Sequence, residues 1–461
     1  MTDVPALTAT ELLAAYAART LSPSEVWAAL EPHIAAWEPK IRALYAYDPD
    51  GAREAAALST QRWARAEPIG PLDGVPVTVK EMIATRGVPV PYGTAATELV
   101  PATADAPPAA RLREAGAIIF AKTTAPDYGM LSSGVSSFHA TTRNPWDLAA
   151  NPGGSSSGAG AAGAAGFGPL HLGTDIGGSV RLPAGWCGLV GLKPSLGRVP
   201  IDPYYVGRVA GPMTRTVEDA SLMMQVISAP DPRDAMALPP ADIAWRDLAI
   251  DLSGLRIGLM LDAGCGMAVE DEIKAAVEAA ARRFAEAGAR IVPVEPVMTR
   301  AMLDGLNDYW RCRSWADIGA LPAERREKVL PYILEWAQGG AAISGARAIQ
   351  GFNQTFDIRR SAARAFAQVD AILSPVYPVA RFAAELASPE NDPQRPFEHI
   401  VFTVPWNMAE QPALSINCGF TGGGMPIGLQ IIGPRFADLT VLRLARAFET
   451  LRAGAMPWPF L

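Results

Sequence analysis

A glycine- and serine-rich stretch from residue 151 to 194 constrains the fold of this 461-residue chain more than any other feature. Thirteen of the 42 glycines lie between residues 151 and 191. Glycine costs backbone entropy and adds no side-chain packing, so such a density is expected where the backbone turns through positive φ or approaches a ligand closely. A flexible linker would lack the Leu, Ile, Val and Trp residues embedded in this stretch. We therefore predict a buried functional core, with a tightly packed small-residue helix over residues 158–168.

Composition excludes several classes of protein. Hydrophobic residues make up 49% of the chain and charged residues 19%, which is typical of a globular protein. The net charge of −7 argues against a surface dedicated to nucleic acid or to anionic membranes. The cysteines and histidines are scattered and form no CxxC pair, so we expect no metal site, no disulfide framework and no cofactor. They are Cys187, Cys265, Cys312, Cys418, His33, His139, His171 and His399.

The beginning of the chain carries no targeting signal that we recognise. Asp3 and Glu11 interrupt it, and it has no continuous apolar run, unlike a signal peptide. No stretch approaches the roughly 18 apolar residues that a membrane span requires. These features predict a cytoplasmic protein without a membrane partner.

Helical and extended patterns alternate along the chain. Capping boxes begin two helices, at Thr8 to Glu11 and at Ser22 to Glu25, and residues 52–66 are expected to form a third. Residues 75–80 have the composition of a short strand, and small-residue helices then alternate with buried strands. This pattern favours one large α/β/α layered domain, with a mixed central sheet covered by helices on both faces.

We expect this domain to span residues 1–461 in three parts. N-terminal helices occupy residues 1–66, and a core that contains the Gly/Ser stretch occupies residues 70–230. A helical part follows at residues 300–369, and its many aromatic residues are expected mostly to pack in the core, although some of them can line a substrate pocket. A proline-rich loop at 229–243 is the only candidate boundary, but strands are expected on both sides of it.

Three chemistries could use the Gly/Ser stretch. A phosphate-binding loop would need a lysine, and residues 153–163 contain none. Residues 154–158 match the pattern G-x-S-x-G, which would make Ser156 the nucleophile of a hydrolase with His399 as the only usable histidine. The third chemistry uses serines and a lysine, because burial can lower the pKa of a lysine until it acts as a base. Lys80 ends an apolar run and fits this role, but the local sequence alone favours an ordinary salt bridge from Lys80 to Glu81 or another acid.

Longer motifs resemble the amidase signature family of Ser–cisSer–Lys amidohydrolases. The strongest lie between residues 74 and 195, and weaker likeness covers nearly the whole chain. The matching segments are GVPVTVKE from Gly74, RNPW from Arg143, PGGSSSG from Pro152, GTDIGGSVRLP from Gly173, CGLVGLKP from Cys187, GPMTRT from Gly211, DAILSP from Asp370 and MPIGLQ from Met425.

The resemblance implies a role for each matching residue. Ser179 corresponds to the nucleophile, Ser155 to the bridging serine that follows a cis peptide bond, and Lys80 to the base. The backbone N–H groups of Ile176, Gly177, Gly178 and Ser179 are expected to form the oxyanion hole. Ser156, Asp175 and Arg181 are expected to support these loops. Met130, Leu131 and Ser132 match a loop that contacts the substrate in relatives.

The implied activity is hydrolysis of a small-molecule carboxylic amide through an acyl-Ser179 intermediate. The many aromatic residues and low charge favour a neutral apolar or aryl amide. Alternatives are a small polar amide of the biuret or urea type, the glutamine-hydrolysing component of an amidotransferase, and a binding protein without activity. The amidotransferase branch has an acid three residues before a threonine, where this chain has Ile400 before Thr403. A homodimer is compatible with these expectations.

Overall fold

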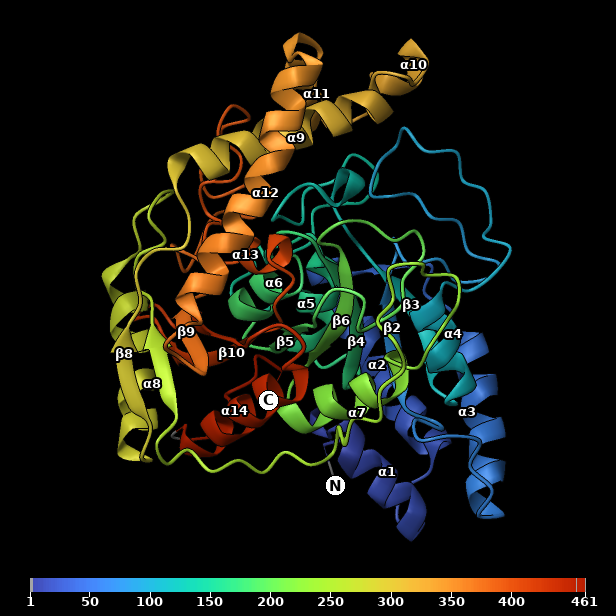
Figure 1. Cartoon of the computed structure of the whole chain (residues 1–461). Coiled ribbons are helices and arrows are strands. Elements are labelled where there is room, and N and C mark those ends of the chain that lie inside the picture. The colour runs from blue at the N-terminus through green and yellow to red at the C-terminus, as the bar shows by residue number, and fades with distance from the viewer. Residues whose placement is uncertain (1–2, 453, 461) are drawn as a thin grey trace.

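The computed structural model describes residues 3–452 and 454–460 of the chain. One sheet of eleven strands forms its centre (Figure 1), in the order β1-β3-β2-β4-β6-β5-β10-β11-β9-β7-β8. The strands are β1 (Leu44–Tyr45), β2 (Pro76–Lys80), β3 (Ile118–Thr123), β4 (Leu170–Asp175), β5 (Val190–Lys193), β6 (Val209–Thr214), β7 (Arg256–Leu259), β8 (Arg290–Pro293), β9 (Ala371–Pro375), β10 (Ala413–Phe420) and β11 (Pro426–Ile432).

The sheet is mixed, as predicted. Strand β2 runs parallel to both β3 and β4, and β7 runs parallel to both β8 and β9. The central strands β4, β6, β5, β10, β11 and β9 pair antiparallel. Since the sheet continues across the proline-rich loop at 229–243, that loop does not separate two sheets. The division of the chain into three parts of one domain stays a prediction.

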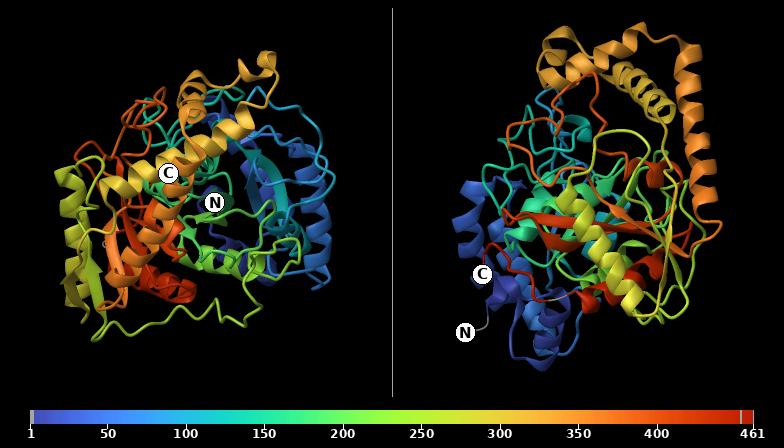
Figure 2. Two further views of the ribbon diagram at one scale, coloured as in Figure 1. Left: turned by 45° about the horizontal axis from the view of Figure 1, so that its top comes forward. Right: turned by 90° about the vertical axis from the view of Figure 1, so that its left-hand side faces the viewer.

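Helices cover both faces of this sheet (Figure 2). They are α1 (Ala9–Ala18), α2 (Pro23–Ile41), α3 (Pro49–Ala64), α4 (Pro107–Glu114), α5 (Ser157–Ala164), α6 (Arg181–Trp186), α7 (Val217–Ile227), α8 (Asp271–Glu286), α9 (Arg300–Ile318), α10 (Ala323–Arg326), α11 (Pro331–Gln338), α12 (Gly345–Ala365), α13 (Val404–Met408) and α14 (Asp438–Leu451). Short 3-10 turns are η1 (Val4–Ala6), η2 (Asp127–Gly129) and η3 (Gly339–Ala342).

The N-terminal helices begin where their caps predict. Thr8 and Ser22 each accept a hydrogen bond from the backbone of a glutamate three residues later, and both capping boxes are complete. The third helix starts at Pro49, three residues before its predicted start, because the Asp48 side chain caps it. Helix α1 is anchored to the core by buried Asp219, whose carboxylate accepts from the N–H groups of Ala9 and Thr10 at 2.9 and 3.1 Å.

The Gly/Ser stretch forms the buried centre of the molecule. Helix α5, built only from Ser, Gly and Ala, is wholly buried and packs against β2, β3, β4 and β6. A Cβ at Gly158 would lie 2.2 Å from the carbonyl oxygen of Ala43, so a larger residue cannot fit there. The predicted small-residue helix is confirmed, although it ends four residues before Gly168.

Helices α9, α11 and α12 pack on one another and stand above the end of the sheet (Figure 1). Residues of α9 and α11 line one pocket together with residues of the loops that follow β3 and β4. The predicted helical part at residues 300–369 is therefore placed beside the predicted catalytic residues.

Candidate active site

Lys80 is the last residue of β2, and its side chain is fully buried. Its Nζ donates to Ser155 Oγ at 2.8 Å and to Thr174 Oγ1 at 3.0 Å. Burial, together with the positive charge of Arg208, lowers the pKa of Lys80 to about 7. Because its neighbours are hydroxyl groups and not a carboxylate, Lys80 can be neutral near pH 7 and accept a proton. The alternative of a salt bridge to Glu81 is wrong, since Glu81 pairs with His139 at 2.9 Å.

The loop before α5 presents Ser155 to this lysine. The peptide bond between Gly154 and Ser155 is cis, as the resemblance implies. Gly153 has φ = 81°, and a Cβ there would lie 2.3 Å from the Trp186 ring. A Cβ at Gly154 would lie 2.4 Å from the backbone nitrogen of Ser133. Only glycine therefore fits at these two positions, which explains part of the unusual composition of the stretch.

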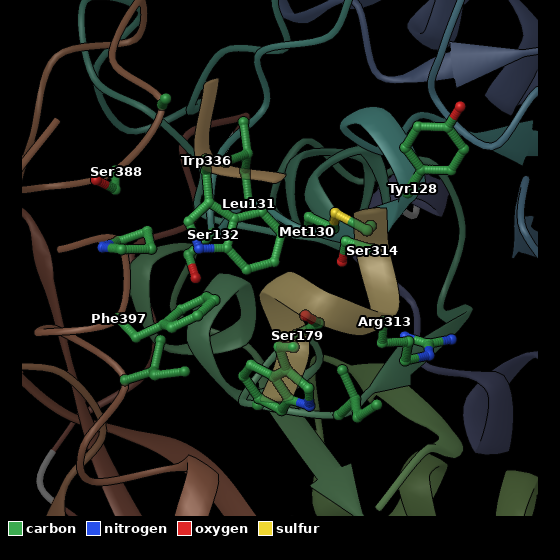
Figure 3. Close-up of a pocket in the computed structure, with 17 residues that line it drawn as sticks. Tyr128, Met130, Leu131, Ser132, Ser179, Arg313, Ser314, Trp336, Ser388 and Phe397 are labelled. Carbon is green, nitrogen blue, oxygen red and sulfur yellow. The ribbon is translucent and has the colours of Figure 1, made fainter. Parts of the chain in front are cut away.

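Ser179 lies on the loop that follows β4, and its side chain reaches the floor of a pocket (Figure 3). Its carbonyl oxygen accepts from the N–H of Ser156 at 3.1 Å, which joins the two serine loops. The bonds to Lys80 bring Ser155 and the base together. A hydrogen bond between the Ser155 and Ser179 hydroxyls is not among those of the described residues.

Three of the four predicted oxyanion donors are available in the structure. The N–H groups of Ile176, Gly177 and Ser179 carry no hydrogen bond to any described residue. The N–H of Gly178 donates to Asp175 Oδ1 at 2.8 Å, so the prediction that Gly178 points its N–H at the oxyanion is wrong. Gly178 is needed for another reason, because its φ of 133° favours glycine.

A buried ion pair fixes the shape of this loop. Asp175 and Arg181 are both fully buried, and their side chains join at 2.9 Å. Burial alone would raise the pKa of Asp175, but the Arg181 guanidinium outweighs it and holds that pKa well below its usual range. Asp175 also accepts from the N–H groups of Gly178 and Val180, so the carboxylate organises the backbone around Ser179.

Residues from the C-terminal third complete the network around Arg181, and sequence reasoning missed them. Its guanidinium donates to the Thr403 carbonyl oxygen, Gln430 Oε1 and Asn407 Oδ1 at 2.9, 2.7 and 2.6 Å. Thr403 Oγ1 in turn donates to the carbonyl oxygen of Gly177 at 2.6 Å. Gln430 is the last residue of the matching motif MPIGLQ, and this match was the one sequence feature that could have indicated its role.

Ser156 has a structural position. It is fully buried, and its Oγ bonds with the carbonyl and N–H groups of Thr174 at 3.2 and 3.3 Å. His399 pairs with Glu390 and makes no hydrogen bond to Ser156. The geometry therefore disfavours a nucleophile-elbow hydrolase built on Ser156, and it agrees with the predicted supporting role.

The pocket above Ser179 has aromatic and aliphatic walls. Met130, Leu131 and Ser132 line it, as predicted, and Trp310 and Trp336 are the two aromatic residues of 301–369 that do so. The other lining residues are Tyr128, Gly129, Ile176, Gly177, Ser179, Arg313, Ser314, Ala387, Ser388, Pro396, Phe397 and Ile400. Figure 3 shows Leu131, Trp336 and Phe397 on one side of Ser179 and Arg313 on the other. Arg313, Ser388 and Phe397 were not predicted, because no local pattern sets them apart.

Among residues 3–452 and 454–460, no group of three or more His, Cys, Asp or Glu side chains could hold a metal ion. Within the same residues, no helix is long and apolar enough to cross a membrane.

Known proteins resemble this chain over nearly its whole length. The family model described as Amidase matches residues 25–442. An acylamidase of Rhodococcus erythropolis is 33% identical over 464 residues, which cover 98% of this chain and 96% of that protein. The A subunit of the glutamyl-tRNA(Gln) amidotransferase of Myxococcus xanthus is 36% identical over 482 residues, with 96% of each chain covered.

Solved structures agree with these sequence matches. A bacterial aryl acylamidase of the amidase signature family superposes with a TM-score of 0.88 at 28% identity and covers 98% of each chain. A 6-aminohexanoate cyclic dimer hydrolase superposes with a TM-score of 0.89 over all of both chains, and its 24% identity supports the fold alone.

Proposed function

This chain belongs to the amidase family and is an amide-cleaving hydrolase, and we propose that it works through an acyl-enzyme on Ser179 with Ser155 and Lys80 as its proton relay. The buried contact between Lys80 Nζ and Ser155 Oγ at 2.8 Å is the observation that carries this proposal. A lysine whose pKa is lowered to about 7 can take a proton at neutral pH, which a surface lysine cannot.

In the proposed reaction, the proton moves from Ser179 to Ser155 and from Ser155 to Lys80 as Ser179 Oγ attacks the amide carbonyl carbon. The relay then runs in reverse and protonates the nitrogen of the leaving group. An amide requires this step, because an unprotonated amide nitrogen is a very poor leaving group. A water molecule enters next, and the same relay activates it to hydrolyse the acyl-Ser179 ester.

The N–H groups of Ile176, Gly177 and Ser179 are proposed to stabilise the oxyanion. Each donor of this kind contributes about 3 kcal/mol to transition-state stability in acyl-transfer enzymes. These N–H groups cost no reorganisation during the reaction, since Asp175 and Thr403 already hold the loop through Gly178 and Gly177.

The proposed substrate has an apolar or aryl acyl group. Trp310, Trp336 and Phe397 are buried in the pocket wall, where they can contact a ring or an alkyl chain. The glutaminase alternative is less well supported, because Ile400 lines the pocket where the amidotransferase branch has an acid. A free amino acid would leave its ammonium group without an anionic partner there.

Turnover of a matched panel tests this proposal. We expect hydrolysis of the para-nitroanilides of phenylacetic and butyric acids, with a higher kcat/KM for the phenylacetyl compound. Hydrolysis of glutamine or biuret without turnover of either anilide would contradict the proposed substrate class. Labelling of Ser179 by a fluorophosphonate, and loss of the label in Ser179→Ala, tests the nucleophile independently of the substrate.

A cytoplasmic location and a homodimer stay predictions. Cell fractionation with an antibody against the chain tests the first. Sedimentation of the purified full chain at several concentrations tests the second.

A further inference from the structure

Arg313 is the only charged residue among the described residues that line the pocket. It lies on α9, one residue before the buried pocket residue Ser314. Its side chain is exposed, which places it at the open end of the pocket, whereas the aromatic side chains of the opposite end are buried. The pocket is therefore polarised, with Ser179 between the side that holds Trp336 and Phe397 and a cationic end at Arg313 (Figure 3).

The guanidinium of Arg313 is held in place without being neutralised. Its Cζ lies 3.9 Å from the centroid of the Tyr205 ring, a cation–π distance. The Tyr205 hydroxyl is itself hydrogen-bonded to the Tyr309 hydroxyl, one turn before Arg313 on α9. In the described part of the chain, no Asp or Glu forms an ion pair with Arg313, and Asp317, one turn later on α9, is near enough for its charge to act on Tyr205. A stacked arginine keeps its in-plane N–H donors free for a ligand.

A second arginine increases the positive charge at this end. Arg208 lies on the same loop as Tyr205, donates to the carbonyl oxygen of Pro203 at 3.1 Å and forms no ion pair with a described carboxylate. Burial lowers the pKa of Arg208, and the nearby charge of Arg313 contributes to that shift. The two positive charges repel each other and favour the binding of an anion, and Asp202 offsets part of the charge of Arg208.

The cationic end lies at the exposed side of the pocket, and this position relates it to the departure of the leaving group. After Ser179 is acylated, the amine product must depart and water must enter while the acyl group stays bound. The exposed end allows this exchange, and the buried aromatic end can hold the acyl group. We infer that Arg313 recognises a carboxylate on the amine portion of the substrate, which makes the substrate class N-acylated amino acids or aminobenzoates with an apolar acyl group. This inference rests on the proposed function and replaces the expectation of a neutral substrate.

Two chromogenic amides test it on the full chain. They are the para-nitroanilide of phenylacetic acid and the same compound with a carboxylate on the aniline ring beside the nitro group. We expect the native chain to have a kcat/KM about tenfold higher for the anionic amide, since a hydrogen bond to a charged group changes binding by at least about this factor. In Arg313→Gln the anionic amide loses that advantage through a higher KM, while the neutral amide changes less than about twofold.

Further variants separate recognition from general damage. Arg313→Lys should keep part of the preference, because lysine retains the charge and loses the planar fork. Arg364→Gln removes an exposed charge from α12 outside the pocket and should leave both kinetic constants unchanged. Tyr205→Leu, which removes the stacking surface, should raise KM for the anionic amide alone. Equal losses on both amides in Arg313→Gln, or a native preference for the neutral amide, would overturn the inference.

A binding measurement keeps the inference separate from the proposed function. In Ser179→Ala, the carboxylated nitroaniline product should bind more tightly than para-nitroaniline, and Arg313→Gln should abolish that difference. If the native chain hydrolyses neither amide, the proposed acyl class is wrong. Calorimetric measurement of the binding of the two anilines still tests the role of Arg313 in that case. Equal binding of the two anilines would overturn it.

Discussion

The serine loops and the helices α9–α12 contribute to the same pocket in different ways. In the loops, the polar side chains are buried, and glycines occur where a Cβ would collide with a neighbour. In the helices, a few side chains reach the pocket while most of the helical surface packs or faces solvent. The proposed reaction thus depends on the buried network of the serine loops, in which few substitutions fit. The choice of substrate depends on helix side chains that can be substituted without a change of the fold.

Loss of the nucleophile gives the largest expected effect on the loop side of this comparison. Ser179→Ala should lower kcat for the phenylacetyl anilide by about 10⁴-fold or more, because the covalent intermediate can no longer form. Ser156→Ala is the matched control in the same stretch. It should keep fluorophosphonate labelling and lose about 1–3 kcal/mol of unfolding free energy, since buried Thr174 groups lose a partner. Labelling that persists in Ser179→Ala would contradict the assignment.

Removal of the base gives the next effect. Lys80→Met keeps most of the buried volume and should lower kcat by roughly 10²- to 10⁴-fold, the range of general base catalysis. In the native chain, kcat/KM should rise with pH through about 7 and then level off, since the neutral lysine is the active form. Arg208→Gln should shift that inflection to higher pH, because the charge of Arg208 lowers the pKa of Lys80. A profile without an inflection near pH 7 would remove Lys80 from the relay.

Two ion pairs, one buried in the serine loops and one at the helical surface, test the comparison through the free energy of unfolding. Asp175→Asn leaves Arg181 without its buried counter-ion and should lower the free energy of unfolding by about 3–5 kcal/mol. Asp308→Asn removes the ion-pair partner of Arg347, whose side chain is 63% exposed. This substitution should change the free energy of unfolding by less than about 1 kcal/mol. Urea denaturation of both variants measures the difference. Similar losses would mean that the loop network is no more constrained than the helical surface.

Selectivity should show the smallest effect and should come from the helices. Trp336→Leu is expected to lower kcat/KM for the phenylacetyl anilide by about tenfold and for the acetyl anilide by less than about threefold, because only the larger acyl group reaches the ring. Phe356→Leu on α12 is the control, since this ring is 41% exposed and does not line the pocket. Equal effects of Trp336→Leu on the two substrates would contradict a role in acyl selection.

The sequence singled out candidate residues in the serine loops more readily than in the helices, for a physical reason. Lys80 and Ser155 stand in motifs whose spacing is constrained by close backbone contacts, so they could be recognised without the fold. Trp310 and Trp336 line the pocket while Phe352 does not, yet all three occur on amphipathic helices with the same kind of spacing. Arg313 was missed because nothing in the local sequence distinguishes it from other surface arginines.

Long-range contacts account for the remaining misses. Asn407 on α13 and Gln430 on β11 lie 226 and 249 residues from Arg181 along the chain, and only the tertiary fold brings them together. A sequence motif also does not show which backbone N–H groups are free to bind an oxyanion and which are already hydrogen-bonded. Gly178 belongs to the predicted oxyanion segment, but its N–H is used by Asp175.

The same distance along the chain has a consequence for biosynthesis. On the ribosome, Arg181 is added 249 residues before Gln430, a delay of roughly 12–50 s at about 5–20 residues per second. Until then its guanidinium lacks the carbonyl and amide oxygens that surround it in the finished protein. The nucleophile loop therefore reaches its working shape only when translation is nearly complete, so a nascent chain that stalls before this point has all three proposed catalytic residues and no formed active site.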